Sequence, residues 1–267
     1  MTALKILIQV ITDIYRNPRF LFFVVVPVHL VIAVFSNCLQ LIQNGYNLGW
    51  PKNEAFLLLL LATAALITVL LLASTAIGWH RLVLSPAHYP TLQSAMSNQP
   101  RWRYLKRAVP LFLIAAIIVT IAYLPAQWIV REFVLYEPHS TSYPLQFLAG
   151  VFVFYGGPVL FNFIWTTLGL GLPAIALGQR AHWRLSANWR LQHSGSLVLI
   201  LAPVLVLSAI VTQRLDAIYF YSTFKNLPGV FMIEALKGAW SGLTALVLLG
   251  LITRFYEQLV QPQASGT

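Results

Sequence analysis

Charged side chains are scarce in this sequence of 267 residues. Asp, Glu, Lys and Arg together make up 9% of the chain, whereas a soluble domain carries about 25%. The hydrophobic fraction is 58%, and a soluble fold of that composition would expose large apolar patches. The composition therefore excludes an ordinary soluble protein and indicates an integral membrane protein.

Acidic residues and cysteine are the rarest of the chemically active types. Seven Asp and Glu residues leave few carboxylate pairs for acid–base catalysis or for binding a hard metal ion. The lone cysteine, Cys38, excludes an internal disulfide framework. HExxH, GxSxG, phosphate-binding-loop and CxxC motifs do not occur in the sequence. We therefore expect no catalytic residues, no metal site and no cofactor.

Long apolar runs fill most of the chain instead. A bilayer core about 30 Å thick requires about 20 apolar residues in a helix, and helices satisfy their own backbone groups in lipid. The sequence therefore predicts an all-α transmembrane bundle with six spans in a single membrane domain, residues 1–267. The six runs lie near residues 20–38, 55–78, 108–130, 147–178, 195–212 and 229–252.

The positive charge falls in alternate gaps between these runs. Twelve Lys and Arg residues flank one side of the predicted bundle and four flank the other, and the excess marks the cytoplasmic side. Both termini are therefore expected in the cytoplasm. The net charge of +10 is explained by topology and by anionic lipid headgroups, so we expect membrane lipids as partners and no nucleic acid. The twelve are Lys5, Arg16, Arg19, Arg81, Arg101, Arg103, Lys106, Arg107, Arg180, Arg184, Arg190 and Arg254.

Residues 1–18 have the pattern of an amphipathic helix at the membrane interface. Asn17-Pro18 is expected to end this helix before the first span, because proline disfavours helical geometry in the residue before it. The apolar face is predicted to comprise Leu4, Leu7, Ile8, Ile11, Ile14 and Tyr15, and the polar face Lys5, Gln9, Thr12, Asp13 and Arg16.

The fourth run is too long for one straight crossing. Its 32 residues would form a helix of about 48 Å at 1.5 Å per residue. Gly156-Gly157-Pro158 and the stretch Gly169–Pro173 are the expected kinks or breaks. Two interpretations stay open: a kinked helix at the edge of the bundle, or a broken span of the kind that some transporters use at a binding site.

Tryptophan and arginine recur together near the predicted cytoplasmic ends of spans two to five. Indole rings anchor at headgroup depth, and arginine reaches water or phosphate from there. We predict one belt that holds anionic lipid, and residues 179–193 are expected to form a short surface helix. The predicted belt comprises Trp79, Arg81, Arg101, Arg103, Trp183, Arg184, Trp189 and Arg190.

A few polar residues and glycines stand out within the apolar runs. His29 and Asn162 are predicted to form interhelical hydrogen bonds, with a shared polar site in the membrane as the alternative. Gly238 and Gly242 form a GxxxG pair that allows close helix packing, within the bundle or between subunits. Glu234 and Lys237 are spaced to pair on one helical face. They lie inside the membrane if the sixth span starts at Gly229, and at its outer surface if the span starts near Gly238.

Three features together resemble a known type of membrane protein. They are the N-terminal helix ending in Arg-Asn-Pro, the basic exit GWHRLVL after the second span, and the stretch Leu172–Leu191 that closes the fourth. These features resemble the uncharacterised six-span bacterial inner-membrane proteins of the YciC type and the related membrane domain of some glycerophosphoryl diester phosphodiesterases. The resemblance implies a location in the bacterial cytoplasmic membrane. No phosphodiesterase domain is present in the sequence, so that activity is not implied.

Three hypotheses for function follow. The first is a non-enzymatic inner-membrane protein with an accessory role, as a scaffold, a lipid-interacting protein or a subunit of a protein complex or homo-oligomer. The second is a transporter of a small molecule or lipid that uses the broken fourth span. The third is a membrane-embedded enzyme, which would require at least two titratable side chains facing one cleft.

Overall fold

The computed structural model describes residues 3–35, 54–136, 150–179, 185–221 and 227–264. All secondary structure in these ranges is helical, which confirms the predicted fold class. Five helical stretches are long and apolar enough to cross a membrane, so the chain is a multi-pass membrane protein. The five stretches are Pro18–Phe35, Ala55–Leu84, Arg101–Trp128, Leu197–Ile218 and Met232–Gln258.

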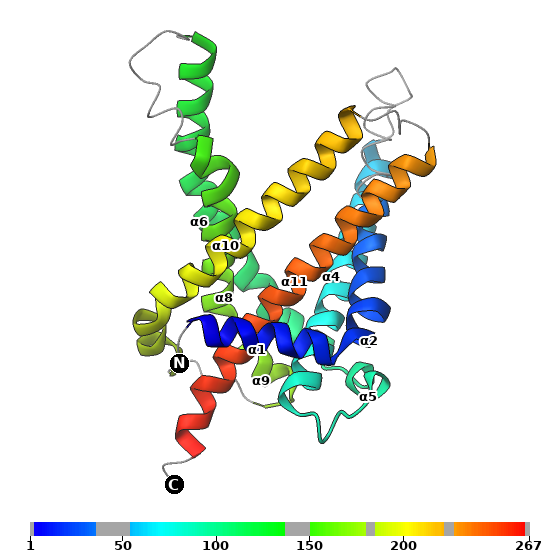
Figure 1. The fold of residues 1–267 in the computed structure, drawn as a ribbon, viewed down its shortest axis with the longest axis vertical. Helices are drawn as coiled ribbons and strands as arrows, with labels where there is room; N and C mark the ends of the chain where they lie inside the picture. Colours follow the sequence, from blue (N-terminus) through cyan, green and yellow to red (C-terminus); the bar gives the residue numbers. More distant parts are fainter. Residues whose placement is uncertain (1–2, 36–53, 137–149, 180–184, 222–226, 265–267) are drawn as a thin grey trace.

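The N-terminal segment forms a helix that lies across the long helices before the chain enters the first of them (Figure 1). Helix α1 spans Ala3–Arg16 and ends at Asn17, as predicted. Pro18 opens α2 (Pro18–Phe20), where its missing N–H has no helical partner to lose. A π-helical turn, η1 (Leu21–Val25), follows, and the helix continues through residues 26–35.

The second and third runs form longer helices than the hydropathy predicted. Helix α4 (Glu54–Leu84) continues two turns past the expected end at residue 78. The segment between the two helices contains the short helix α5 (Leu92–Met96), which Thr91 caps through the backbone N–H of Ser94. Helix α6 (Arg101–Tyr136) begins immediately after Pro100, so its basic first turns are helical.

The fourth run is irregular at both predicted places, with a π-helical turn at the first and a break at the second. The π-helical turn η2 (Phe152–Gly156) leads into α8 (Gly157–Gly169), with Pro158 in its first turn. Helix α8 stops before Gly171, and the short helix α9 (Leu172–Ala176) follows. Gly178, at φ +79°, ends α9, since the N–H groups of Gly178 and Gln179 bond back to the carbonyls of Ile175 and Ala174. A proline therefore lies in the first turn of both α8 and α9, and the left-handed glycine ends α9.

The chain ends with two long helices, α10 (Leu185–Tyr221) and α11 (Leu227–Ala264). The prediction of a separate surface helix in residues 179–193 is wrong, because α10 runs without interruption from Leu185 into the apolar span. Helix α11 contacts α1, η1, α4, α8 and α10. It therefore occupies the centre of the packing.

One row of residues along α11 contacts the N-terminal segment over most of its length. A Cβ on Gly238 would lie 3.3 Å from the His29 carbonyl oxygen, and one on Gly242 would lie 3.1 Å from Val25 Cγ1. About two turns further on, a Cβ on Gly250 would lie only 2.5 Å from Val10 Cγ1. Small residues at this spacing let two helices approach closely. The row of Gly238, Gly242, Leu246, Gly250 and Arg254, spaced four residues apart, is the glycine seam.

Candidate functional site: the basic end of the bundle

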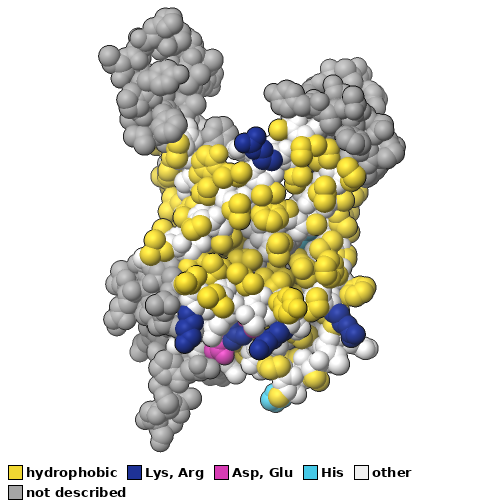
Figure 2. All heavy atoms as spheres, in the orientation of Figure 1, with side chains coloured by type: hydrophobic (Ala, Val, Ile, Leu, Met, Phe, Trp, Pro, Cys, Tyr) yellow, Lys and Arg dark blue, Asp and Glu magenta, His cyan; other side chains and the backbone are white. Residues whose placement is uncertain are grey.

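Basic side chains gather at one end of the molecule, where α1, α5, the start of α6 and the C-terminal part of α11 lie (Figure 1). Figure 2 shows Lys and Arg side chains along the edge of a broad apolar surface at this end. We call this region the basic end. Its exposed cations on α1, the following turn and α6 are Lys5, Arg16, Arg19, Arg101, Arg103, Lys106 and Arg107.

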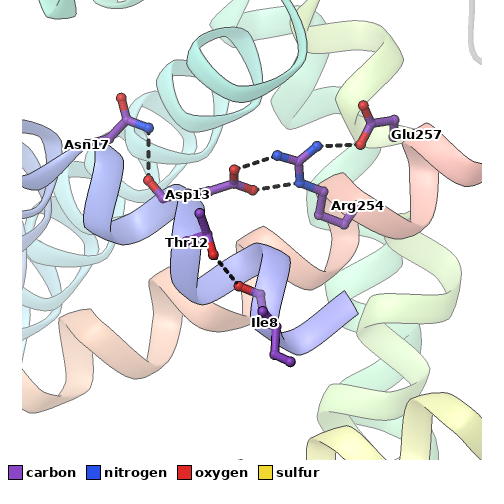
Figure 3. A network of polar contacts seen from close by, with 6 residues as sticks. All are labelled: Ile8, Thr12, Asp13, Asn17, Arg254 and Glu257. Atoms are coloured by element: carbon purple, nitrogen blue, oxygen red, sulfur yellow. Dashed lines mark hydrogen bonds and ion pairs between the residues drawn. The ribbon is translucent and has the colours of Figure 1, made fainter. Parts of the chain in front are cut away.

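An ion-pair cluster fastens α1 to α11 at the basic end. The Arg254 guanidinium donates to both carboxylate oxygens of Asp13, with Nε 2.6 Å from Oδ2, and its Nη1 donates to Glu257 Oε2 at 2.5 Å (Figure 3). Asp13 is buried, and the two-pronged geometry is the strongest form of this pairing. Arg254 is the last residue of the glycine seam. The cluster, here called the α1 clamp, thus fixes α1 where the close packing ends.

A second arginine of the basic end is turned inward. Arg81, on the last turns of α4, is 6% exposed. Its Nε donates to the Ala176 carbonyl at 3.0 Å, and Nη1 and Nη2 donate to the carbonyls of Ser97 at 2.6 Å and Asn98 at 3.1 Å. The Tyr89 ring lies 4.8 Å from the guanidinium carbon. No ion pair among the described residues includes Arg81.

Arg81 therefore satisfies carbonyl groups that two short helices leave open. Helix C-termini carry partial negative charge and carbonyls without helical donors. Ala176 ends α9, and Ser97 and Asn98 directly follow α5. The guanidinium joins both segments to α4, which explains how an arginine without a carboxylate partner is accommodated inside the protein.

A buried polar triad joins α4, α6 and α11 beside Arg81. His80 Nδ1 lies 2.8 Å from Thr253 Oγ1, and Tyr104 Oη lies 3.4 Å from His80 Nε2. The Thr253 hydroxyl donates to the Leu249 carbonyl at 2.7 Å, so Nδ1 is the donor toward Thr253 and Nε2 accepts from Tyr104. A neutral imidazole satisfies all three contacts, which makes the triad a structural link between the helices.

The predicted belt divides into inward and outward residues. Trp79 is fully buried against Phe20, with ring centroids 5.5 Å apart, and Arg81 bonds to backbone carbonyls. Their assignment to an outward-facing belt is wrong, because α4 continues past residue 78 and carries both side chains into the core. Arg101 and Arg103 are exposed. Trp183 and Arg184 lie outside the described residues, and the side chains of Trp189 and Arg190 do so too.

His29 and Asn162 both form hydrogen bonds within their own helices. His29 Nδ1 lies 3.0 Å from the Val25 carbonyl oxygen, and Asn162 Nδ2 donates to the Pro158 carbonyl at 2.9 Å. The His29 ring also lies against Gly242 of the glycine seam. No described hydrogen bond joins either residue to another helix, so the predicted interhelical bonds are not found among the described contacts.

The opposite end of the bundle carries a smaller charged cluster. Lys237 Nζ lies 2.9 Å from Glu234 Oε1, which confirms the pair expected from their spacing. Lys237 also pairs with Asp216 of α10, a contact that local spacing could not predict. This cluster links α10 to α11 at the end away from α1.

No protein-family model, curated protein or solved structure matches the chain. Within the described ranges, no group of three His, Cys, Asp or Glu side chains is placed to hold a metal ion. The most organised features are therefore the α1 clamp, the Arg81 contacts and the exposed cations around them. The clamp was missed from the sequence because its partners Asp13 and Arg254 lie 241 residues apart.

Proposed function

We propose that the chain crosses the membrane six times and that both termini face the cytoplasm. The fourth crossing would comprise η2 and α8, which lie between the candidate spans Arg101–Trp128 and Leu197–Ile218. Support comes from the position of α1 and the end of α11 at the same end of the bundle (Figure 1), and from the exposed cations gathered there. An excess of Lys and Arg marks the cytoplasmic side of a membrane protein.

Reporter fusions test this topology. A periplasm-active phosphatase fused after Thr267 is expected to be inactive, and one inserted within residues 137–143 is expected to be active. A cytoplasm-active reporter at the same two sites serves as the control and should give the opposite pattern. Activity of the phosphatase after Thr267 would contradict the proposed orientation.

The proposed role is that of a non-enzymatic accessory protein of the bacterial inner membrane that binds anionic lipid at its basic end. The observation that carries this proposal is the set of exposed cations on α1, the following turn and α6. They belong to the end of the molecule where Figure 2 shows Lys and Arg side chains at the edge of an apolar surface. Trp102 is exposed beside them, with Lys106 Nζ 5.3 Å from its ring centroid. An exposed indole among cations suits a headgroup region.

Lipid retention tests the proposed role. Replacing both Arg101 and Arg103 by Gln is expected to weaken binding of phosphatidylglycerol about 30-fold at low salt, because each cation near an anionic surface contributes about 1 kcal/mol. Native mass spectrometry of the purified protein would count bound lipids. Lysine at both positions should retain the lipid, and Arg214→Gln, an exposed change on α10 at the other end, should have no effect. Equal retention by the Gln variant and the wild type would refute lipid binding here.

A transporter of a small molecule or lipid is the second candidate. The observation that favours it is the double interruption of the fourth run, with a π-helical turn before Pro158 and a break before α9. It requires water to reach the inside of the bundle. A cysteine at Asn162 that reacts with a polar reagent added to either side of the membrane would favour this candidate.

A further inference from the structure

Helix α1 presents its apolar residues outward and its carboxylate inward. Leu4, Ile8, Ile11 and Tyr15 are 66%, 53%, 54% and 85% exposed. Their spacing of four, three and four residues places them in one stripe along the helix. The opposite face, with Ile6, Val10 and Asp13, is buried against the bundle.

The charge that remains on the outer surface of α1 is positive. Lys5 and Arg16 on α1 and Arg19 in the next turn are exposed. Asp13 is the only acidic residue of α1, and the α1 clamp holds it against Arg254. The outer surface therefore combines four large apolar side chains with cations and no carboxylate. That combination complements a leaflet that contains anionic lipid.

The position of α1 also points to a leaflet. Only Asn17 separates α1 from the candidate span Pro18–Phe35, so α1 lies at the level where that span enters the membrane. It crosses the long helices instead of continuing along them (Figure 1). Gly250 and the clamp hold it there from the inner side.

We propose that α1 is a membrane-seating helix whose outer stripe of Leu4, Ile8, Ile11 and Tyr15 lies in an anionic leaflet, and that the α1 clamp keeps the Asp13 carboxylate away from that leaflet. This inference rests on the proposed basic, lipid-binding end and adds the surface that enters the membrane. It also assigns the clamp a purpose beyond packing. Without Arg254, the Asp13 carboxylate would be an unpaired charge on the buried face of α1. To hydrate it, α1 would have to rotate or lift, which would bring the carboxylate toward the anionic headgroups that repel it.

Depth-dependent quenching tests the seating. In a Cys38→Ser background, a single cysteine at Ile8 or Ile11 would carry an NBD label. The protein would be placed in nanodiscs of phosphatidylcholine alone or with about one third phosphatidylglycerol. Lipids with a nitroxide near the headgroup are expected to quench both labels at least threefold more than a label at Gln93, an exposed position on α5. If the labels at Ile8 and Ile11 are quenched no more than the label at Gln93 in both kinds of nanodisc, the proposal is overturned.

Charge variants test the part assigned to the clamp. Arg254→Gln is expected to reduce the quenching at Ile8 in phosphatidylglycerol nanodiscs and to leave it nearly unchanged in phosphatidylcholine. The double variant Asp13→Asn with Arg254→Gln removes the released carboxylate and should restore quenching. An equal loss in both variants and both lipids would show that the clamp acts only through packing and would overturn its assigned role.

Two further outcomes are distinguished by the same samples. Labels that quench one another as protein concentration rises, without lipid quenching, would assign the stripe to a second copy of the chain and overturn the proposal. The proposed lipid binding can fail separately: the Arg101 and Arg103 variant would then retain its phosphatidylglycerol while the α1 labels are still quenched.

Discussion

Replacing Arg81 by methionine is expected to lower the free energy of unfolding by about 2–4 kcal/mol. Methionine keeps an apolar stem but donates nothing to the carbonyls of Ala176, Ser97 and Asn98. Each buried carbonyl left without a donor costs about 1–3 kcal/mol, and water can replace the donor only at the partly exposed ones. Thermal unfolding in detergent should show a fall of about 4–8 °C, at about 2 °C per kcal/mol.

Arg101→Met is the matched control for this prediction. Arg101 is exposed and donates to Ser74 Oγ at 2.8 Å, so its replacement is expected to change the midpoint by less than about 2 °C. The two arginines both lie beside a tryptophan-containing segment in the sequence but are expected to differ in effect: Arg81 supports the fold, and Arg101 is proposed to bind lipid. An equal loss of stability in both variants, or a stable Arg81→Met protein, would contradict the role assigned to Arg81.

Replacing Gly250 by leucine is expected to cost about 3 kcal/mol and to displace α1. The first side-chain atom alone would lie 2.5 Å from Val10 Cγ1, and Val10 is fully buried and stiff at its branched Cβ. Overpacking of this kind costs about 1–3 kcal/mol when neighbours can shift, and more when they cannot. Thermal unfolding measures the loss, and faster trypsin cleavage at Arg16 would report release of the helix.

Gly195→Leu provides the matched control. No atom lies within 4 Å of a Cβ at Gly195 of α10, so leucine there is expected to be neutral or to stabilise the helix by up to about 1 kcal/mol.

Two smaller substitutions test the contact between Gly250 and Val10 directly. Gly250→Ala and Val10→Ala should each destabilise the protein, but together they should cost less than the sum, because Val10 Cβ lies at 3.4 Å, an ordinary contact distance. If the losses of stability in the two single variants simply add in the double variant, the contact between Gly250 and Val10 does not explain the effect of Gly250→Leu.

Local sequence rules predicted the elements that depend on nearby residues. Asn17-Pro18 ends α1, and the two stretches that contain glycine and proline make the fourth run irregular, because each acts on backbone geometry within a few residues. Hydropathy placed the long helices but missed their ends. Helix α4 continues to Leu84 because His80 and Arg81 form hydrogen bonds inside the protein. Average hydropathy along the chain does not take such hydrogen bonds into account.

The sequence by itself determined that this is a helical, multi-pass membrane protein with its cations gathered in alternate gaps. Composition and the length of apolar runs are enough for that, since lipid leaves the backbone few alternatives. Only the tertiary structure decided which cations face outward and which are used inside. Arg81, Arg101 and Arg254 look alike in the sequence, yet one joins two helix ends, one is exposed and one clamps Asp13. The difference arises from segments that are distant in the chain, because a buried charge must be matched by whatever the fold brings beside it.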